Sequence, residues 1–423
     1  MALEKATERI EIILPEHFPG KLNFSPGGSK SISNRALVIS ALSDHETTIH
    51  GLSDSEDTEI MQRLLDQREG IFDAGHAGTC FRFMTAYLAL QPGTQVLTGS
   101  SRMQQRPVSP LVDALRKLGS QVKYLGKEGY PPIEISSIDT ENYIPEVSIP
   151  GDVSSQFISA LMMIGVKLPQ GLEISILPPV LSRPYLDMTA SIMQEFGAKV
   201  DIADSRIFIH PGRYAKRTFH VEADWSSASY PIGLMAIIRQ GQLKVGGLKD
   251  KSLQGDSAIL EIASHWGLNF EFDKEGLWVI AGELTANPQM EWDFSSSPDL
   301  APTVMAVNAA LGIEAKYSGL KSLRIKESDR IRSMQRNLEQ GGVGLVVKRA
   351  VNGNEEIAFQ SGSFCFDNEF IIETFDDHRI AMACSLLAAK GKVTVMDPEV
   401  IIKSYPEYWQ QLRENGFGIS RQG

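Results

Sequence analysis

The sequence predicts an α/β protein built from six copies of one unit, in which a strand, a helix, a strand, a second helix and two further strands follow one another. Six segments begin with polar or small residues and continue as an apolar helix, and each is followed by a β-patterned run, a loop and an amphipathic helix. The starts of the six segments are separated by 48, 76, 72, 70 and 80 residues. Because the first interval is the shortest, the first copy is expected to be truncated, with strands missing between Asp57 and Asp73. The starts are Ser31, Thr79, Ser155, Ser227, Ser297 and Asp377.

The first helix of each copy is expected to be surrounded by protein. Alanine, glycine and methionine occupy nearly every face, as in "SSQFISALMMIG" and "APTVMAVNAAL". Serine, threonine or aspartate at the start should act as an N-cap, because a side-chain oxygen can accept a hydrogen bond from an unpaired backbone N–H group. The segments cover residues 29–42, 77–90, 153–165, 225–237, 295–311 and 375–389.

A β-patterned run and an amphipathic helix complete each copy. The runs "TQVLT", "LEISIL", "QLKV" and "KVTVM" are short and bounded by glycine or proline, as strands are. The helix that follows is charged on one side, so it should cover the buried helix from solvent. The clearest examples span residues 93–124, 171–202, 241–272 and 391–419.

Composition limits the class of protein. A chain of 423 residues with 42% hydrophobic and 22% charged residues is long enough for more than one globular domain. Its longest apolar stretches fall short of the ~18 residues that span a bilayer, and no secretory or transit peptide is visible. Three widely spaced cysteines fit a reducing compartment, so we expect a cytoplasmic protein without a membrane partner. A net charge of −11 argues against a nucleic-acid partner, so any anionic ligand must meet a local basic pocket.

The stretch "SPGGSKSISNRALVISAL" predicts an anion site at a helix start. A Walker phosphate loop is excluded, because with Lys30 and Ser31 as its Lys-Ser pair it needs glycine where the chain has Phe24 and Ser29. Helix N-termini carry partial positive charge and free N–H groups, so several converging starts can hold an anion. Polar or charged side chains recur at the other starts, at Gly78, Thr79, Ser154, Ser155, Gln156, Asp299, His378 and Arg379.

Ten ordered blocks resemble the 5-enolpyruvylshikimate-3-phosphate synthase family, from Pro26 to Trp409. The blocks are "PGGSKSISNRAL", "AGTCFRF", "RMQQRP", "GDVSSQFISALM", "SRPYLDMT", "ADWSSASYPI", "SSPDLAPT", "RIKESDRI", "FDDHRIAMA" and "IIKSYPEYW". The resemblance implies a two-domain inside-out α/β barrel with three repeats in each domain and helices pointing at a central cleft. It places residues 1–28 and 222–423 in one domain, on the phosphoenolpyruvate side with the catalytic carboxylates, and residues 29–221 in the other, on the shikimate 3-phosphate side.

The resemblance also implies a reaction. Members of this family transfer the enolpyruvyl group of phosphoenolpyruvate to the 5-hydroxyl of shikimate 3-phosphate and release phosphate, without a metal or an organic cofactor. We expect the protein to act as a monomer on these two small molecules. It further implies that the shikimate 3-phosphate site contains Lys30, Ser31, Arg35, Ser154, Ser155, Gln156, Ser182, Tyr185, Asp299, Ser322 and Lys326. The implied phosphoenolpyruvate site contains Lys30, Gly78, Arg106, Gln156, Glu327, Arg330, Arg379 and Lys403.

Addition to and elimination from a vinyl carbon need a base for the attacking hydroxyl and an acid for the methylene carbon. We assign these roles to Asp299 and Glu327, with Lys30 assisting the departure of phosphate. Surrounding cations should lower the pKa of Asp299, which suits a base. The same cations make Glu327 a weaker acid unless burial opposes them.

Simpler readings stay open at this point. "KESDR" is also typical of a solvated helical charge pattern, "DDHR" of a helix cap with a surface pair, and "SSQ" of a cap alone. The chain departs from the family pattern at His76, Phe83 and Ser322. Alternative functions are an enolpyruvyl transferase for a UDP-amino sugar, which would carry a cysteine in the loop "SSRMQQRPVSP", and a noncatalytic phosphometabolite-binding protein.

Overall fold

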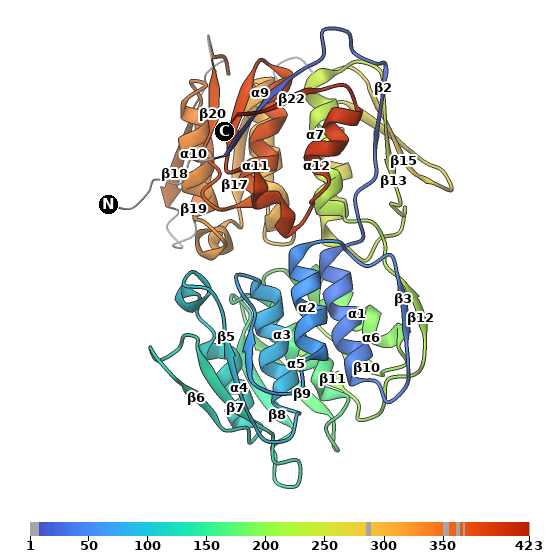
Figure 1. Cartoon of the computed structure of the whole chain (residues 1–423), viewed down its shortest axis with the longest axis vertical. Helices are drawn as coiled ribbons and strands as arrows, with labels where there is room; N and C mark the ends of the chain where they lie inside the picture. The colour runs from blue at the N-terminus through green and yellow to red at the C-terminus, as the bar shows by residue number, and fades with distance from the viewer. Residues whose placement is uncertain (1–7, 285–288, 350–354, 361–363, 367–368, 423) are drawn as a thin grey trace. The chain divides into compact units, whose positions relative to one another are not determined.

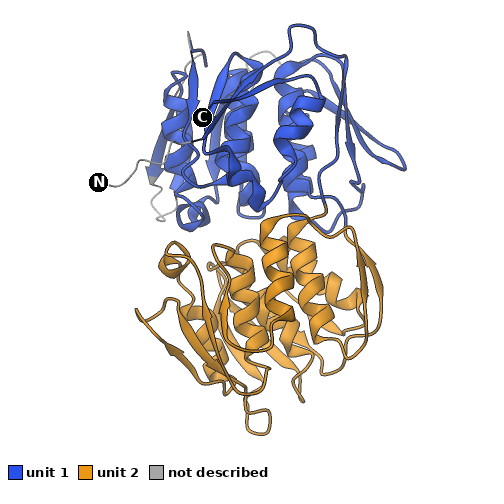
Figure 2. Cartoon of the chain, viewed as in Figure 1, with its two compact units in different colours: residues 1–27, 222–423 blue, residues 28–221 orange. Residues whose placement is uncertain are grey.

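The computed structural model describes residues 8–284, 289–349, 355–360, 364–366 and 369–422. The chain divides into two compact units (Figure 2). Unit 1 comprises Met1–Gly27 and Glu222–Gly423, and unit 2 comprises Gly28–Val221. The first seven residues of the predicted N-terminal segment lie outside the described residues.

Unit 2 alternates strands and helices along most of its length (Figure 1). Its helices are α1 (Lys30–Leu42), α2 (Glu56–Asp66), α3 (Gly78–Leu88), η1 (Met103–Gln105), α4 (Ser109–Lys117), α5 (Ser155–Gly165) and α6 (Arg183–Glu195). Its strands are β3 (Thr48–His50), β4 (Ile71–Asp73), β5 (Thr94–Thr98), β6 (Val122–Tyr124), β7 (Ile133–Ser136), β8 (Glu146–Pro150), β9 (Leu172–Leu177), β10 (Val200–Ile202), β11 (Arg206–Ile209) and β12 (Thr218–His220).

Unit 1 has the same alternation, with its first two strands supplied by the start of the chain. Its helices are α7 (Trp225–Ile238), η2 (Gly255–Ala258), α8 (Ile259–Ser264), η3 (Pro298–Leu300), α9 (Ala301–Leu311), η4 (Lys321–Ile325), α10 (Arg330–Glu339), α11 (His378–Ser385), η5 (Leu386–Ala389), η6 (Pro398–Lys403) and α12 (Tyr408–Glu414). Its strands are β1 (Arg9–Ile13), β2 (Lys21–Phe24), β13 (Gln242–Gly246), β14 (Leu268–Phe272), β15 (Gly276–Ala281), β16 (Gln289–Asp293), β17 (Glu314–Ser318), β18 (Gly344–Arg349), β19 (Glu355–Gln360), β20 (Phe370–Ile372), β21 (Val393–Met396) and β22 (Gly418–Gln422).

The strands of the described residues form five four-stranded sheets and one two-stranded sheet. Every four-stranded sheet has one parallel pair followed by two antiparallel pairs. The orders are β4-β5-β7-β6, β8-β9-β11-β10, β2-β13-β15-β14, β16-β17-β19-β18 and β20-β21-β1-β22.

The sixth sheet is the parallel pair of β3 and β12. The chain passes from α2 directly into β4, which belongs to another sheet. The segment between Asp57 and Asp73 therefore supplies no strand to the sheet of β3.

The small-residue helices form the interior of each unit, as their composition predicts. In α5 only Gln156 is not buried, and in α9 only Leu311 is not buried. Helix α5 packs against α3 and α6, and α9 packs against α7 and α11. By contrast α4 is amphipathic: it buries Leu111 and Leu115 and exposes Lys117. None of the helices in the described part of the chain is long and apolar enough to cross a membrane.

The N-cap prediction is confirmed at three helix starts. Ser154 caps α5, Asp224 caps α7 and Asp377 caps α11 through side-chain oxygens. The prediction is wrong at three others, because Ser29 before α1 and Ser297 before η3 make no side-chain cap hydrogen bond, and Ala77 before α3 has no side-chain oxygen. Helices α1 and α3 therefore begin without a side-chain acceptor, as a helix start that receives an anionic ligand can.

Candidate functional site

Asp299 is surrounded by three cations of unit 1. It lies in η3, immediately before the buried helix α9. Its Oδ1 accepts a hydrogen bond from Arg330 Nη1 at 2.8 Å and lies 3.4 Å from Lys326 Nζ. Its Oδ2 accepts a hydrogen bond from Arg379 Nη2 at 3.1 Å. The structure thus brings four of the predicted site residues into direct contact.

Arg330 is the centre of this cluster. The side chain is 2% exposed, although Arg330 opens the charged helix α10. Its Nη2 donates to Glu327 Oε2 at 2.7 Å, and its Nε donates to Asp377 Oδ2 at 2.8 Å. One guanidinium therefore connects three carboxylates from three different segments, which only the planar fork of arginine can do. The solvated-pattern reading of "KESDR" is wrong for Arg330.

The charges of the cluster keep Asp299 ionised. Burial alone would raise the pKa of Asp299, but Arg379, Lys326 and Arg330 together lower it below its usual value. Burial has the opposite effect on Lys326, whose pKa is lowered despite the attraction of Asp299. For Arg330, burial opposes the charged form, and the carboxylates of Asp377, Glu327 and Asp299 overcome it and raise its pKa. The arrangement holds Asp299 in the ionised form, which is the form that a base needs.

Glu327 joins Lys403 to the same cluster. Its Oε1 lies 3.4 Å from Lys403 Nζ, and Lys403 is buried at the end of η6. Ser322 lies in η4, four residues before Lys326. Within the described ranges, no hydrogen bond joins Ser322 to the cluster, so its predicted role gains no support from these contacts.

Asp377 is a site residue that sequence reasoning did not single out. The pattern "DDHR" predicts a helix cap with a surface pair. The structure confirms the cap, because Oδ1 accepts a hydrogen bond from the Arg379 N–H group at 3.0 Å. The surface reading is wrong, because Asp377 is fully buried and pairs with Arg330. The signal that could have found it is an aspartate at the start of a buried, small-residue helix, since a buried carboxylate requires a cationic partner.

In unit 2, Lys30 lies at the first position of α1, beside a buried carboxylate. Its Nζ lies 3.5 Å from Asp57 Oδ2, and Asp57 belongs to α2. Figure 1 shows α1, α2 and α3 side by side, and α2 contacts both neighbours. Asp57 Oδ1 is buried and accepts no hydrogen bond from the described residues. Sequence reasoning missed Asp57, which orients Lys30.

Arg35 is locked into the interior of unit 2. Its Nε donates to Thr189 Oγ1 at 2.7 Å and its Nη1 donates to the Ser31 carbonyl oxygen at 2.8 Å. The guanidinium lies over the rings of Phe83 and Tyr185. Burial lowers its pKa to about 10, against the effect of Tyr185. These contacts connect three predicted site residues, Ser31, Arg35 and Tyr185, and give the departure at Phe83 a packing role.

Two buried arginines flank the start of α3. A methyl group on Gly78 would lie 2.5 Å from both Arg106 Nη1 and Arg82 Nη1, so this position accepts only glycine without a shift. Arg82 Nη1 donates to the Gly78 carbonyl oxygen at 2.9 Å. Arg106 Nε is buried and has no hydrogen-bond partner among the described residues. Arg82 was not predicted as a site residue, although its place one helical turn after Gly78 is visible in the sequence.

Gln156 connects the starts of α5 and α3. Its Nε2 donates to Thr79 Oγ1 at 2.8 Å, and its Oε1 is buried without a donor among the described residues. Ser154 Oγ accepts a long hydrogen bond of 3.4 Å from the Gln156 N–H group, and the neighbouring Ser155 is buried. The two serines and Gln156 therefore lie at one helix start, as predicted.

Ser182 holds an unusual backbone conformation before α6. Its φ is 55°, in the left-handed region that costs about 1–2 kcal/mol for a residue with a Cβ atom. Its carbonyl oxygen accepts a hydrogen bond from the Tyr185 N–H group at 3.1 Å. His76 is another position at which the chain departs from the family pattern. Its side chain is partly exposed, and its Nε2 lies 3.0 Å from Glu56 Oε2.

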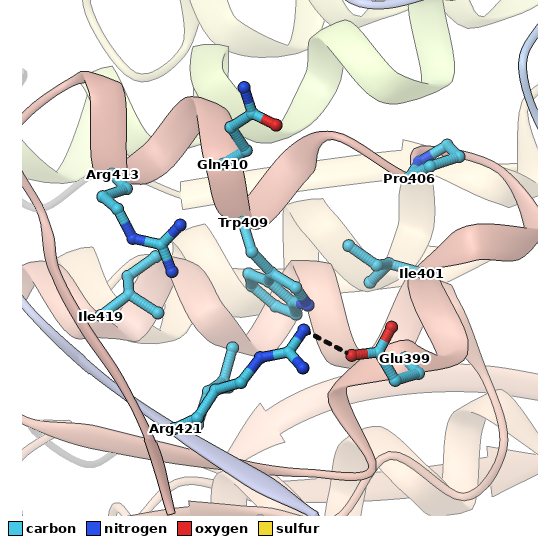
Figure 3. A pocket seen from close by; sticks show the side chains of 9 residues that line it. Glu399, Ile401, Pro406, Trp409, Gln410, Arg413, Ile419 and Arg421 are labelled. Carbon is cyan, nitrogen blue, oxygen red and sulfur yellow. Dashed lines mark hydrogen bonds and ion pairs between the residues drawn. The ribbon is translucent and has the colours of Figure 1, made fainter.

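A separate pocket of about 230 Å³ lies against α12 in unit 1 (Figure 3). The ion pair between Arg421 and Glu399, 2.8 Å long, crosses it beneath the ring of Trp409. None of the predicted site residues lines this pocket. Its lining residues are Ile10, Glu399, Ile401, Pro406, Trp409, Gln410, Arg413, Ile419 and Arg421.

The fold and these clusters define an α/β protein of two units that concentrates buried cations at helix starts. A sequence model of the EPSP synthase (3-phosphoshikimate 1-carboxyvinyltransferase) family matches residues 17–69 and 62–412. A 3-phosphoshikimate 1-carboxyvinyltransferase of Bacteroides fragilis strain YCH46 is 39% identical over 394 residues, which cover 92% of this chain and 94% of that protein. One from Sulfurovum sp. strain NBC37-1 is 35% identical over 426 residues, 94% of this chain and 96% of that protein.

The fold comparison agrees. A solved structure of an EPSP synthase from Acinetobacter baumannii covers 99% of this chain and 100% of its own, with a TM-score of 0.75 and 20% identity. The chain therefore belongs to the EPSP synthase family, and its fold is the two-domain α/β fold of those structures.

Proposed function

We propose that the protein transfers the enolpyruvyl group of phosphoenolpyruvate to the 5-hydroxyl of shikimate 3-phosphate and releases phosphate. Family membership supports this reaction. The observation that carries it is the position of Asp299, a carboxylate kept ionised by Arg330, Arg379 and Lys326. Both substrates are anions, and these cations together with the arginines beside Gly78 supply positive charge that the acidic chain otherwise lacks.

We propose one set of the predicted residues for each substrate, with Lys30 and Gln156 in both sets. For shikimate 3-phosphate we propose Lys30, Ser31, Arg35, Ser154, Ser155, Gln156, Ser182, Tyr185, Asp299, Ser322 and Lys326. For phosphoenolpyruvate we propose Lys30, Gly78, Arg106, Gln156, Glu327, Arg330, Arg379 and Lys403. The buried Nε of Arg106 supports the second assignment, because a buried donor without a partner is costly unless a ligand supplies one.

The proposed chemistry is an addition followed by an elimination. The 5-hydroxyl oxygen attacks C2 of phosphoenolpyruvate while its proton passes to Asp299, and C3 receives a proton from Glu327. In the second step the Glu327 carboxylate takes a proton from C3, the double bond between C2 and C3 forms again, and the bond between C2 and the phosphate oxygen breaks, so that phosphate leaves. Lys30, held 3.5 Å from Asp57, stabilises the departing phosphate.

We further propose that each unit is an inside-out barrel of three βαβαββ repeats. Five sheets with one strand order and the two-stranded sheet of β3 and β12 support six copies, the first of them truncated. The predicted domain roles follow, with the catalytic carboxylates in unit 1 and the shikimate phosphate serines in unit 2. We propose that the protein acts as a monomer in the cytoplasm, a reducing compartment that suits its free cysteines.

Phosphate release tests the function. The protein is incubated with shikimate 3-phosphate and phosphoenolpyruvate together, and with each alone. We expect release only with both substrates. Replacing shikimate 3-phosphate with a UDP-amino sugar should give none. Binding of both substrates without phosphate release would favour a noncatalytic phosphometabolite-binding protein.

A further inference from the structure

A buried carboxylate outside the predicted site lies behind Arg379. Asp256 belongs to η2, between β13 and α8, and is 4% exposed. Ser226 Oγ donates a short hydrogen bond to Asp256 Oδ2. The other oxygen, Oδ1, is buried and accepts no hydrogen bond from the described residues. A buried carboxylate with a single hydroxyl partner is energetically unfavourable, which points to a role beyond packing.

Ser226 connects this carboxylate to the Asp299 cluster. It lies in the first turn of α7, and its Oγ accepts a hydrogen bond from Arg379 Nη2 at 3.3 Å. The same Nη2 donates to Asp299 Oδ2 at 3.1 Å. Because the Ser226 hydroxyl donates its hydrogen bond to Asp256, a lone pair of that hydroxyl is left to accept one from Arg379. The direction of one hydrogen bond therefore fixes the next.

We infer that Asp256 is a positioning residue for Arg379, acting through Ser226 to orient its guanidinium and to adjust its attraction for the anionic group of phosphoenolpyruvate. This inference rests on the proposed function, in which Arg379 binds that substrate. The carboxylate of Asp256 orients Arg379 through the hydroxyl and adds a negative charge behind it. The first effect favours productive binding, and the second weakens the attraction of any anion in front of it.

The charge of Asp256 changes within an accessible pH range. Burial, together with the nearby carboxylates of Asp299 and Asp224, raises the pKa of Asp256 to about 6, although Arg379 and the Ser226 hydrogen bond oppose the shift. These are the charged groups that face it, from η3, from the N-cap of α7 and from α11. Asp256 is therefore neutral at pH 5 and ionised at pH 8.

Asparagine and alanine separate the two effects. Asp256→Asn resembles the protonated, neutral form of Asp256. Its amide oxygen can still accept the hydrogen bond from the Ser226 hydroxyl, but the side chain carries no charge. At pH 5 we expect the KM of Asp256→Asn for phosphoenolpyruvate to equal that of the wild type. At pH 8 we expect it to be about tenfold lower, because removing a negative charge a few ångströms behind Arg379 strengthens the attraction for the substrate by that order of magnitude. The ratio of the two enzymes cancels the titration of the substrate itself.

Asp256→Ala removes the acceptor as well. Its KM for phosphoenolpyruvate should exceed that of Asp256→Asn about tenfold at both pH values, with kcat changed less than threefold and KM for shikimate 3-phosphate unchanged. Ser226→Ala should raise KM for phosphoenolpyruvate by the same factor. The variant that carries both alanines should have a KM close to that of either single variant, because both substitutions break the contact of Asp256 with Arg379 through Ser226.

Glu222→Gln is the matched control, since Glu222 is also buried and hydrogen-bonded, to Trp225 Nε1 and Ser252 Oγ. We expect it to lower stability without a pH-dependent change in KM. Equal KM values for wild type and Asp256→Asn at pH 8, or the same profile in Glu222→Gln, would overturn the inference.

A readout without turnover separates this inference from the reaction. The Asp256 carboxyl is titrated by 13C NMR in the wild type and in Arg379→Gln. Because Arg379 favours the ionised carboxylate, its loss should raise the pKa of Asp256. An unchanged pKa overturns the coupling. A raised pKa in Arg379→Gln, together with no phosphate release by the wild type, leaves the coupling intact and refutes the proposed function.

Discussion

Replacing Arg330 by methionine should strongly destabilise unit 1. The guanidinium is almost completely buried and contacts Asp299, Glu327 and Asp377 at 2.7–2.8 Å. Without it, Asp377 keeps, among the described residues, the hydrogen bonds from the Ser328 hydroxyl and the Arg379 N–H group. Removing one partner from a buried ion pair typically costs about 3–5 kcal/mol, because the remaining charge is left uncompensated. For a domain of this size the loss corresponds to a fall in Tm of roughly 10 °C.

The pH dependence of this loss has a definite sign. In the wild type the lowered pKa of Asp299 contributes stability above the pKa of the unfolded chain, and that contribution is lost as the pH falls below about 4. In Arg330→Met the carboxylates lose a cation, so their pKa values rise and protonation relieves the repulsion at a higher pH. The difference in Tm between the two proteins should therefore be largest near pH 8 and should narrow towards pH 5.

Thermal unfolding followed by circular dichroism measures both effects. Arg336→Met is the control, because Arg336 lies on the same helix with its side chain 54% exposed, forms a 4.0 Å ion pair with Glu373 and lies over the ring of Phe375. Such a surface pair contributes about 0–1 kcal/mol. An Arg330→Met protein whose Tm falls no further than that of Arg336→Met would refute the view that Arg330 connects the cluster.

Three further predictions concern single side chains. Asp299→Ala should lower kcat by ~10²- to 10⁴-fold while shikimate 3-phosphate still binds within roughly tenfold in calorimetry, and near-normal turnover would exclude Asp299 as the base. Arg106→Ala should raise KM for phosphoenolpyruvate by about ten- to a hundredfold and KM for shikimate 3-phosphate far less, and equal effects would place Arg106 in the other subsite. In urea unfolding, Asp256→Asn should be more stable than the wild type by up to about 3 kcal/mol at pH 8 and equally stable near pH 4. The reason is that the raised pKa of Asp256 lowers the stability of the wild type as the pH rises from about 4 through 6. A constant difference across this range would contradict the Asp256 assignment.

Local patterns predicted the elements that depend on local sequence. The small residues of α5 and α9 identify them as buried helices, since no other arrangement hides so many apolar faces. The polar residues at helix starts predicted part of the clusters, and resemblance supplied the rest. The small-residue composition and the polar residues at helix starts are both properties of single segments, so they can be recognised without knowing which other segments pack against them.

Contacts between distant segments could not be predicted in this way. Asp377 meets Arg330 across 47 residues, and Asp256 meets Ser226 across 30. Neither pair has a spacing that a helix or strand imposes, so only the packed fold brings them together. The same holds for β1, which pairs with β22 at the other end of the chain. Capping at α1 was mispredicted for a related reason, because the hydroxyl of Ser29 has the right position in the sequence but makes no hydrogen bond in the described structure.

The fate of one oxygen atom tests the proposed reaction most directly. Phosphoenolpyruvate labelled with 18O in the oxygen between C2 and phosphorus is incubated with shikimate 3-phosphate and the protein, and the released phosphate is examined by 31P NMR. Enolpyruvyl transfer breaks the bond between carbon and oxygen, so all of the label should appear in phosphate. Phosphate without label, or no phosphate when both substrates are present, would contradict the assignment of carboxyvinyl transfer to this protein.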